Sequence, residues 1–455
     1  MNGKSFYYDI INMLRQYGDY AELYIEKAEY SSIVFENKNL ERFENVYDSG
    51  IGLRLIKDFK TYYAFTNSFE IQDIKECADA ICKYSVSNSH NDTLDFTKKN
   101  FDYNFIKLPK DINIKEKIEL VKSVDLNGWN SGFVKQVVTT YKDTIKYIRI
   151  INSEGTDFSQ QLSYITFFCT VICERDGVIQ TGYESLGGLY DFDSFLKEDV
   201  MKVSEKALKR ALLNLDADYA PAGEMTVVLS SSAGGTMIHE AVGHGLEADL
   251  AINGLSVYQG RIGEKVASEK ITVIDDATIA GKRGSFLFDD EGVEAQKTVL
   301  IKDGILVNYM YDRLYAMRNG VESTGNGRRQ SYRYKPIVRM TNTYIDRGKD
   351  DPNKIIKSVD KGILVVKMGG GQVNTVNGDF VFEVNEGYLL KNGDIEKPIR
   401  NATLIGNGPK IMQEIDMVGS DLGFGIGTCG KDGQGVPVSD AQPTIRIPRI
   451  TVGGK

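Results

Sequence analysis

The sequence is short of histidine, of positive charge and of long apolar runs. Its 455 residues include only three histidines, and 55 lysines and arginines face 63 aspartates and glutamates. No stretch approaches the roughly 20 apolar residues that a membrane-spanning helix needs. The first residues, MNGKSFYYDIINMLRQYG, mix charged and apolar side chains and lack the apolar core and cleavage site of a signal peptide. These absences argue against a membrane protein and against a secreted one.

The charge balance also disfavours nucleic-acid binding. A net charge of -8 and a pI of about 5.3 provide no field that attracts nucleic acid or anionic lipid. Arg328, Arg329 and Arg333 form a short basic stretch, but acidic or aromatic residues lie near each of them. We expect these arginines to form structural ion pairs.

Five cysteines occur, an odd number, at positions 77, 82, 169, 173 and 429. Cys77 and Cys82 fall on the apolar face of a predicted helix, and Cys169 and Cys173 fall in a predicted strand. Buried, reduced cysteines behave as small apolar residues, which explains these four. Together with the missing signal peptide, this cysteine usage predicts a cytoplasmic protein.

The chain is too long for a single domain of about 100–200 residues. Turn signals and composition predict an N-terminal α+β domain at 1–90, a central α+β domain at 112–216 and a larger C-terminal domain at 224–455. The polar segment 85–93 resembles a linker, and the Ala-Pro-Ala-Gly stretch at 220–223 marks the second boundary. The C-terminal domain is rich in glycine and in strand patterns with hairpin turns, such as LIKDGIL. The predicted class is α+β, with mixed N-terminal α/β sections followed by mostly antiparallel sheet in the larger C-terminal domain.

Periodicity predicts the main elements of the first two domains. Strands are expected across 20–56 and in the following TYYAFTNS, and an amphipathic helix across 69–86. A helix is expected from residue 112, three strand-rich runs after it, and a closing helix near 196–214.

Two of the three histidines and one glutamate fall in a single short motif, His239-Glu240-x-x-x-His244. The motif follows a predicted strand and is expected to open a helix capped by Ser231 or Ser232. It is similar to the HExxH helix of metalloproteases, in which two imidazoles bind zinc and the glutamate acts as base. One residue is inserted, however. At about 100° per residue, a separation of five leaves the imidazoles about 140° apart on an ideal helix.

A single π-type turn would bring the two imidazoles to one side, and Gly243 makes such a distortion cheaper. The alternative is a helix with one buried and one solvated histidine and no metal. A metal site would also need a third ligand. His90 lies in the polar linker and is expected at the surface. Cys429 is the better candidate, because thiolate binds zinc well and glycines around it allow close approach. It could equally be a reactive or incidental thiol, and nothing in the spacing connects it to His244.

Several longer motifs resemble the TldD/PmbA family, in its metal-bearing TldD branch. GIGLRL at 50–55 resembles the first-domain signature of the family. More specific matches follow in order: SAGGTMIHEAVGHGLEAD, RGSFLFDDEG at 283–292, TGNGRRQSY at 324–332, RMTNT at 339–343 and GTCGKDGQGVPV at 427–438. In the family a glutamate often stands where this chain has Gln330, which puts one local ion pair in doubt.

The resemblance implies a zinc-dependent peptidase with one zinc ion per active subunit. Position by position, His239, His244 and Cys429 become the ligands and Glu240 the base. The resemblance also implies either a homodimer or a heterodimer with a PmbA/TldE-like subunit. Because that branch lacks the motif and this chain retains it, the chain is expected on the active side.

The expected reaction is peptide-bond hydrolysis, in which zinc polarises the scissile carbonyl and lowers the pKa of its bound water to near 7. Glu240 would take the water proton and deliver it to the leaving amine. Acidic residues behind the imidazoles should orient them. A non-proteolytic amidase and a regulatory subunit are the competing functions, the latter because the family has been associated with DNA gyrase.

Unfolded or small peptides are the expected substrates, bound as an added strand at a sheet edge. The segment 368–373, with Gly369, Gly370 and Gly371, is a candidate edge because glycine permits close backbone approach. Alternatively, these glycines form a turn.

Overall fold

A computed structural model of the chain describes residues 3–83, 94–101 and 103–455. The predicted linker at 85–93, with His90, lies outside the described residues. The predicted α+β class is confirmed, with 23% helix and 46% strand. No helix of the described ranges is long and apolar enough to cross a membrane.

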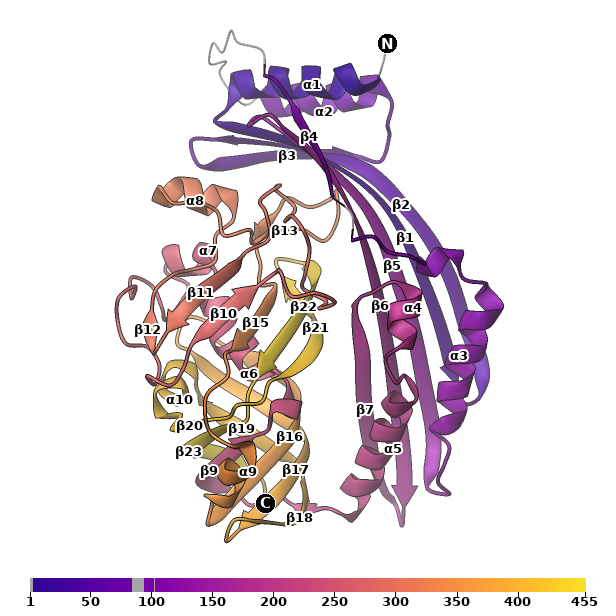
Figure 1. Ribbon diagram of the computed structural model, residues 1–455, viewed down its shortest axis with the longest axis vertical. Helices are drawn as coiled ribbons and strands as arrows, with labels where there is room; N and C mark the ends of the chain where they lie inside the picture. Colours follow the sequence, from indigo (N-terminus) through magenta and orange to yellow (C-terminus); the bar gives the residue numbers. More distant parts are fainter. Residues whose placement is uncertain (1–2, 84–93, 102) are drawn as a thin grey trace.

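One long curved sheet forms the N-terminal part of the molecule (Figure 1). Its strands are β1 (Tyr20–Glu36), β2 (Asn39–Lys57), β3 (Lys60–Thr66), β4 (Thr97–Phe101), β5 (Val134–Asn152), β6 (Thr156–Arg175) and β7 (Val178–Leu189). The order is β3-β2-β1-β5-β6-β4, and β7 also pairs with β6. Strand β1 pairs with β5 from Glu22 opposite Asn152 to Glu36 opposite Val138. Segments of the predicted first and central domains therefore share one sheet, and the domain boundaries remain a prediction.

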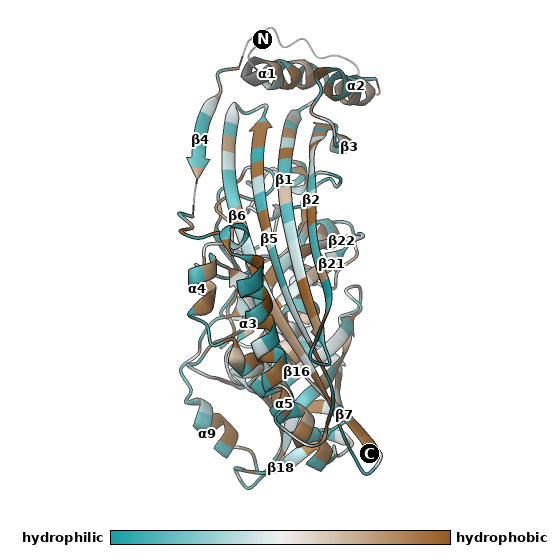
Figure 2. Cartoon of the chain, turned by 90° about the vertical axis from the view of Figure 1, so that its right-hand side faces the viewer, coloured by the Kyte–Doolittle hydropathy of each residue, from teal (hydrophilic) through white to brown (hydrophobic). Residues whose placement is uncertain are grey.

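Helices cover this sheet in two places (Figures 1 and 2). Helices α1 (Gly3–Leu14) and α2 (Ile71–Cys82) lie at one end, and α3 (Ile114–Asn127), α4 (Phe192–Leu196) and α5 (Met201–Asp216) lie along one face. Helix α2 buries Ile74, Ala78, Ile81 and Cys82, a spacing that follows the 3.6-residue helical period. The helices predicted at 69–86, from 112 and at 196–214 are thus present, with shifted ends.

The C-terminal part contains two larger sheets and a short two-stranded one. The first has the order β12-β11-β10-β15-β22-β21: β10 (Val273–Asp276), β11 (Lys297–Lys302), β12 (Ile305–Leu306), β15 (Asn342–Ile345), β21 (Gly423–Lys431) and β22 (Gln434–Gln442). The second has the order β16-β9-β23-β19-β17-β18-β8: β8 (Asp218–Tyr219), β9 (Gly223–Leu229), β16 (Lys361–Val373), β17 (Asp379–Lys391), β18 (Asp394–Arg400), β19 (Ala402–Asn407) and β23 (Ile445–Gly453). Strand β20 (Met417–Val418) pairs with β23, and β13 (Gly327–Arg328) pairs with β14 (Ile337–Val338). The predicted hairpin at LIKDGIL is confirmed by β11 and β12.

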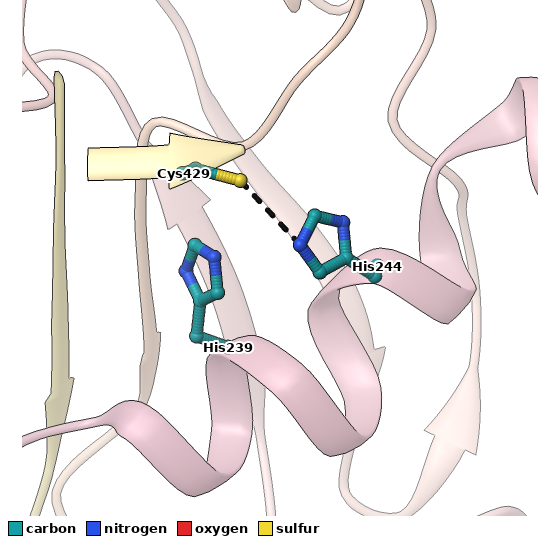
Figure 3. A group of neighbouring side chains, drawn as sticks. All are labelled: His239, His244 and Cys429. Carbon is teal, nitrogen blue, oxygen red and sulfur yellow. Dashed lines mark hydrogen bonds between the residues drawn. The ribbon is translucent and has the colours of Figure 1, made fainter. Parts of the chain in front are cut away.

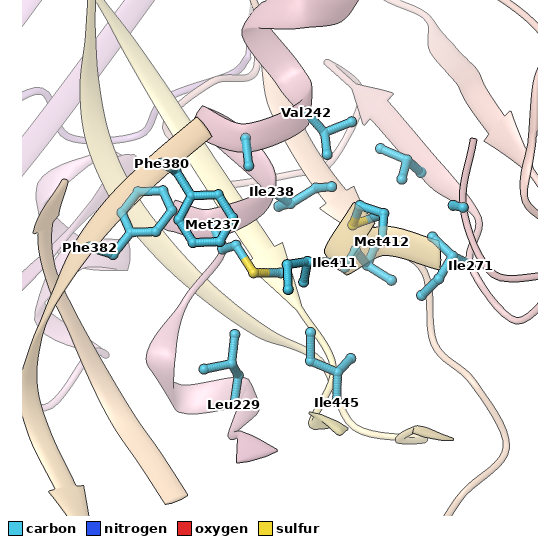
Figure 4. Close-up of a cluster of buried hydrophobic side chains, with 14 of the residues drawn as sticks. Leu229, Met237, Ile238, Val242, Ile271, Phe380, Phe382, Ile411, Met412 and Ile445 are labelled. Carbon is cyan, nitrogen blue, oxygen red and sulfur yellow. The ribbon is translucent and has the colours of Figure 1, made fainter. Parts of the chain in front are cut away.

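The helix that carries the histidine motif packs into the C-terminal core (Figure 4). Its Met237 and Ile238 are buried with Leu229 of β9, Phe380 of β17 and Ile411 of α10 (Gly408–Glu414). Full burial of such a side chain contributes about 1.5–3 kcal/mol relative to exposure. Packing of the apolar face therefore fixes the position of this helix, and the side chains of its polar face are available to bind a ligand.

Buried ion pairs join the N-terminal sheet to the C-terminal part. Arg329 bonds Glu22 of β1, and Arg54 of β2 bonds Glu291. Arg333 bonds Asp48, so ion pairing is confirmed for Arg329 and Arg333. The predicted ion pairing is wrong for Arg328, because its guanidinium donates instead to the carbonyl oxygens of Met340 and Pro437.

Candidate metal centre

The histidine motif lies in an irregular helical segment. A 3-10 turn (Ser231–Ala233) precedes α6 (Thr236–Ile238), a π-helical turn (His239–Gly243), a second 3-10 turn (His244–Leu246) and α7 (Ala248–Ile252). The predicted cap at Ser231 or Ser232 is wrong, because the side chain of Ser230 accepts the Ser232 N–H. Gly234 ends that turn with a φ of 78°, so the histidine helix begins only at Thr236, without a side-chain cap.

The π-type turn predicted from the five-residue spacing is confirmed. The backbone N–H of His244 donates to the carbonyl of His239, which closes the wider turn. As a result the two imidazole rings lie on the same side, with centroids 5.2 Å apart and ring planes at 88°. The arrangement with one buried and one solvated histidine on opposite sides is therefore wrong.

Cys429 approaches the two imidazoles from strand β21 (Figure 3). Its sulfur lies 3.4 Å from Nε2 of His244. One ligand atom from each of His239, His244 and Cys429 lies within 4.8 Å of the others. Ligand atoms around one tetrahedral zinc ion, bound at about 2.0–2.3 Å, lie roughly 3.3–3.7 Å apart. The three side chains thus have the chemistry and the proximity for a shared divalent metal.

Charge interactions within the group shift the pKa of all three side chains. Burial lowers the pKa of both imidazoles, but Cys429 at His239, and Glu247 and Cys429 at His244, outweigh burial and raise the pKa of each histidine. Burial raises the pKa of the Cys429 thiol, but hydrogen bonds and charge from His239 and His244 outweigh burial and lower this pKa to about 5. The thiolate is the form that binds metals. Two imidazoles and one thiolate match the nitrogen and sulfur donors of open zinc sites.

A buried polar group behind His244 orients its ring. Nδ1 of His244 lies 2.8 Å from a carboxylate oxygen of Glu247, and Lys431 lies 3.0 Å from the same oxygen. Burial raises the pKa of Glu247, but Lys431 and His244 lower it to about 2. The ionised carboxylate holds the proton on Nδ1, so Nε2, which faces Cys429, is the nitrogen that would bind a metal in place of its own proton. Sequence reasoning expected an acidic residue here without naming Glu247, although it lies three residues after His244.

Asp440 of β22 anchors the start of the helix. Its Oδ1 accepts the backbone N–H of Gly235 at 3.0 Å. A Cβ at Gly235 would lie 2.2 Å from the backbone nitrogen of Ala441. Gly235 therefore permits the close contact between the helix and the strand that pairs with β21.

Glu240 is half-buried in the π-helical turn. Among the described residues its carboxylate has no hydrogen-bond or ion-pair partner. Gly369, Gly370 and Gly371 lie within strand β16, so the alternative that they form a turn is wrong. Gly371 pairs with Phe382 of β17, Gly369 and Gly370 lie in a bulge of that pairing, and the pairing of β16 with β9 stops at Val365.

Comparison with known proteins gives matches across the chain. Models of the three PmbA/TldA metallopeptidase domains match residues 21–85 (domain 1), 107–215 (central domain) and 222–454 (C-terminal domain). A protein of Buchnera aphidicola (from Acyrthosiphon pisum) named "Metalloprotease TldD homolog" is 38% identical over 448 residues, which cover 96% of this chain and 93% of that protein. A "Zinc metalloprotease TldD homolog" of Saccharolobus solfataricus is 33% identical over 355 residues, 77% of this chain and 79% of that protein.

Solved structures share the fold of this chain. A candidate modulator of a DNA gyrase from Thermotoga maritima has a TM-score of 0.82 at 20% identity, covering 99% of this chain and 100% of that one. TldE from Thermococcus kodakarensis has a TM-score of 0.77 at 19% identity, covering 98% and 99%.

Proposed function

Because the chain belongs to the PmbA/TldD family of metallopeptidases, in its TldD branch, we propose that it is a zinc-dependent peptidase acting on unfolded or small peptides. The observation that carries the proposal is the convergence of His239, His244 and Cys429 on one point. The names of the homologues support a metalloprotease, and one of these names specifies zinc.

In this proposal the three converging side chains hold one zinc ion per subunit. When bound, zinc supplies Lewis-acid chemistry that polarises a scissile carbonyl and makes a water more acidic. Glu240 accepts the proton of the attacking water and passes it to the leaving amine. Glu247 fixes the tautomer and the orientation of His244.

Two sheet edges support an extended peptide as the substrate. Strand β21, which carries Cys429, is the last strand of its sheet and pairs only with β22 within the described chain. Strand β16 is free of β9 beyond Val365, and the segment 368–373 with Gly369, Gly370 and Gly371 follows. Residues of β16 and of β21 line the same groove, so a peptide can add as a strand beside either one.

The substitution Glu240→Gln tests the proposal. We expect the variant to retain its zinc, measured by mass spectrometry of the metal, and to lose peptide hydrolysis by a factor of about 100–10,000. Exposed Glu269→Gln is the matched control and should keep both. Undiminished hydrolysis in Glu240→Gln would rule out this residue as the base.

The choice of substrate distinguishes a peptidase from the two competing functions, an amidase and a regulatory subunit. An amidase would hydrolyse small amides in preference to unstructured peptides, and a regulatory subunit would hydrolyse neither. We further propose a homodimer or a heterodimer with a TldE-like subunit, which the shared fold with a TldE supports. Sedimentation with and without such a subunit distinguishes the two assemblies.

A further inference from the structure

A groove of about 720 Å³ separates the N-terminal sheet from the C-terminal part. Helix α5 and strand β7 line one side of it. Strand β16 at Val366 and Lys367, and strand β21 from Phe424 to Ile426, line the other side. The groove therefore borders both strand edges to which a peptide can add.

Most acidic residues of the groove form ion pairs with basic residues that also line it. Glu184 bonds Lys367 at 3.0 Å and Arg210 at 3.4 Å, and Arg210 also bonds Glu386 at 2.9 Å. Asp199 pairs with Lys202 at 3.1 Å. These pairs neutralise most of the negative charge that lines the groove.

Four lysines of the groove have no carboxylate partner in the described part of the chain: Lys197, Lys206, Lys209 and Lys282. Glu198 is the one groove acid outside those ion pairs, and its carboxylate accepts the Tyr190 hydroxyl at 3.3 Å. The groove thus has an excess of positive charge in a chain whose net charge is -8. A local charge of opposite sign to the whole chain points to an anionic ligand.

Lys282 is the most enclosed of these lysines. Its ammonium lies 4.4 Å from the centroid of the Phe424 ring on β21, and burial lowers its pKa, whereas the charge of Glu198 opposes this decrease. Glu198 favours this ammonium through its charge but lies outside ion-pairing distance, so an anion that enters beside Lys282 would stabilise it further. Lys282 therefore marks the place along β21 where a negative group would be favoured.

The position of the groove along β21 relates it to the metal centre. Phe424 to Ile426 precede Cys429 by three to five residues, which is about 10–17 Å along a strand. A peptide paired with β21, with its scissile bond at Cys429, would therefore place side chains three to five residues away in the groove.

We propose that this groove binds acidic side chains of the substrate, so that the chain prefers peptides with Asp or Glu about three to five residues from the cleaved bond. This preference rests on the proposed peptidase function. Nucleic acid is the other polyanion that a basic groove attracts, but the overall negative charge repels it.

Capped, unstructured peptides test the preference, because their ends carry no charge. One peptide has three glutamates before the cleavable bond, a second has them after it, and a third has glutamines at both places. We expect one acidic peptide to exceed the glutamine peptide in kcat/KM by on the order of tenfold. The variant Lys206→Glu/Lys209→Glu should bring this ratio close to one. The control Lys115→Glu/Lys297→Glu makes the same charge change at exposed positions outside the groove and should keep the ratio.

Binding to the Glu240→Gln variant, followed by fluorescence anisotropy, provides a second measurement. Tighter binding of the same acidic peptide, lost in Lys206→Glu/Lys209→Glu, supports the groove as a carboxylate site even if no peptide is cleaved, and in that case the peptidase function alone fails. Equal cleavage and equal binding of all three peptides overturn the acidic preference while the peptidase function stands. Displacement of the acidic peptide by an equimolar single-stranded oligonucleotide would assign the groove to nucleic acid and overturn the proposal.

Discussion

The sulfur of Cys429 lies 3.4 Å from Nε2 of His244, although 185 residues separate the two along the chain. The histidine lies at the end of a π-helical turn, and the cysteine lies near the end of an edge strand just before a hairpin. Asp432 and Gly433 form that hairpin turn with positive φ angles of 49° and 72°, as in tight two-residue hairpins. The centre therefore exists only when the C-terminal part is folded.

Replacement of Cys429 tests this shared site. We expect Cys429→Ala to lower the zinc content from about one ion per chain to well below one after dialysis, because two imidazoles alone bind zinc weakly. Metal analysis of the purified protein measures the change. Cys173→Ala, at a buried cysteine of strand β6, is the control and should keep its metal. Full zinc occupancy in Cys429→Ala would exclude the thiolate as a ligand.

Glu247 provides a test of how His244 is held. In Glu247→Gln the neutral amide no longer favours the Nδ1 proton of His244, and Lys431 loses one of its two carboxylate partners. We expect zinc affinity to fall by about 10–100-fold, as for other groups that orient a ligand histidine. Competition with a chromophoric chelator measures the affinity. Glu264→Gln, whose exposed side chain bonds Arg261, should leave it unchanged.

The sequence allowed the histidine pair and its geometry to be predicted in advance. A spacing of five residues is incompatible with two ligands on an ideal helix, so only a π-type turn or no metal site remained, and the structure has the turn. The strands from 20 to 56 and the helix around 71–82 were also predictable, the helix because its buried residues follow the helical period. Local patterns of this kind specify local structure.

Contacts between distant segments could not be predicted in this way. The Asp-Gly turn at 432–433 is a local signal for the β21–β22 hairpin, but no local pattern shows that this hairpin packs against the histidine helix and brings Cys429 to it. The helix cap was predicted at the wrong serine because several serines are adjacent in the sequence. The positive φ of Gly234 determines where the 3-10 turn after them ends. Likewise, the ion pair between Glu247 and Lys431 joins residues from opposite ends of the C-terminal region, so local sequence does not show it.

The contact between the histidine helix and β22 requires a glycine at position 235. A Cβ there would lie 2.2 Å from the backbone nitrogen of Ala441 and 2.6 Å from the carbonyl carbon of Asp440. Backbone atoms cannot move aside cheaply, so we expect Gly235→Ala to destabilise the chain by at least about 2 kcal/mol and to weaken zinc binding. Thermal unfolding and zinc competition measure both effects. Gly430→Ala is the control, because a Cβ next to Cys429 would meet nothing within 4 Å.

Gly370 tests whether strand β16 approaches the substrate. A Cβ at Gly370 would meet nothing within 4 Å, and a β-branched residue suits a strand. We therefore expect Gly370→Val to keep its thermal stability. If a peptide backbone lies against this glycine, the variant should raise KM several-fold with little change in kcat. Gly132→Val, at an equally open position outside this segment, should change neither constant. An unaltered KM in Gly370→Val would remove the segment 368–373 from the binding surface.

Asp312 should make stability depend on pH. Burial and the charge of Glu291 raise the pKa of Asp312 to about 8, whereas Arg54 opposes the increase. In the unfolded chain an aspartate has a pKa of about 4. The folded state therefore binds the extra proton between about pH 4 and pH 8, and the stability present below pH 4 is lost as the pH rises through this window.

Asp312→Asn removes this loss and keeps the cap of α8 (Arg313–Asn319), where the Asp312 side chain accepts the Tyr315 N–H at 2.8 Å. We expect the variant to exceed the wild type in apparent Tm by a few degrees at pH 8 and by less at pH 5. Thermal scans in the presence of a chelator exclude a contribution of metal binding to the apparent Tm. Asp351→Asn replaces the exposed cap of α9 (Pro352–Lys357) and should show no such difference between the two pH values. A Tm gain for Asp312→Asn that is equal at pH 5 and pH 8 would mean that Asp312 is ionised throughout this range, with Arg54 rather than burial controlling its charge.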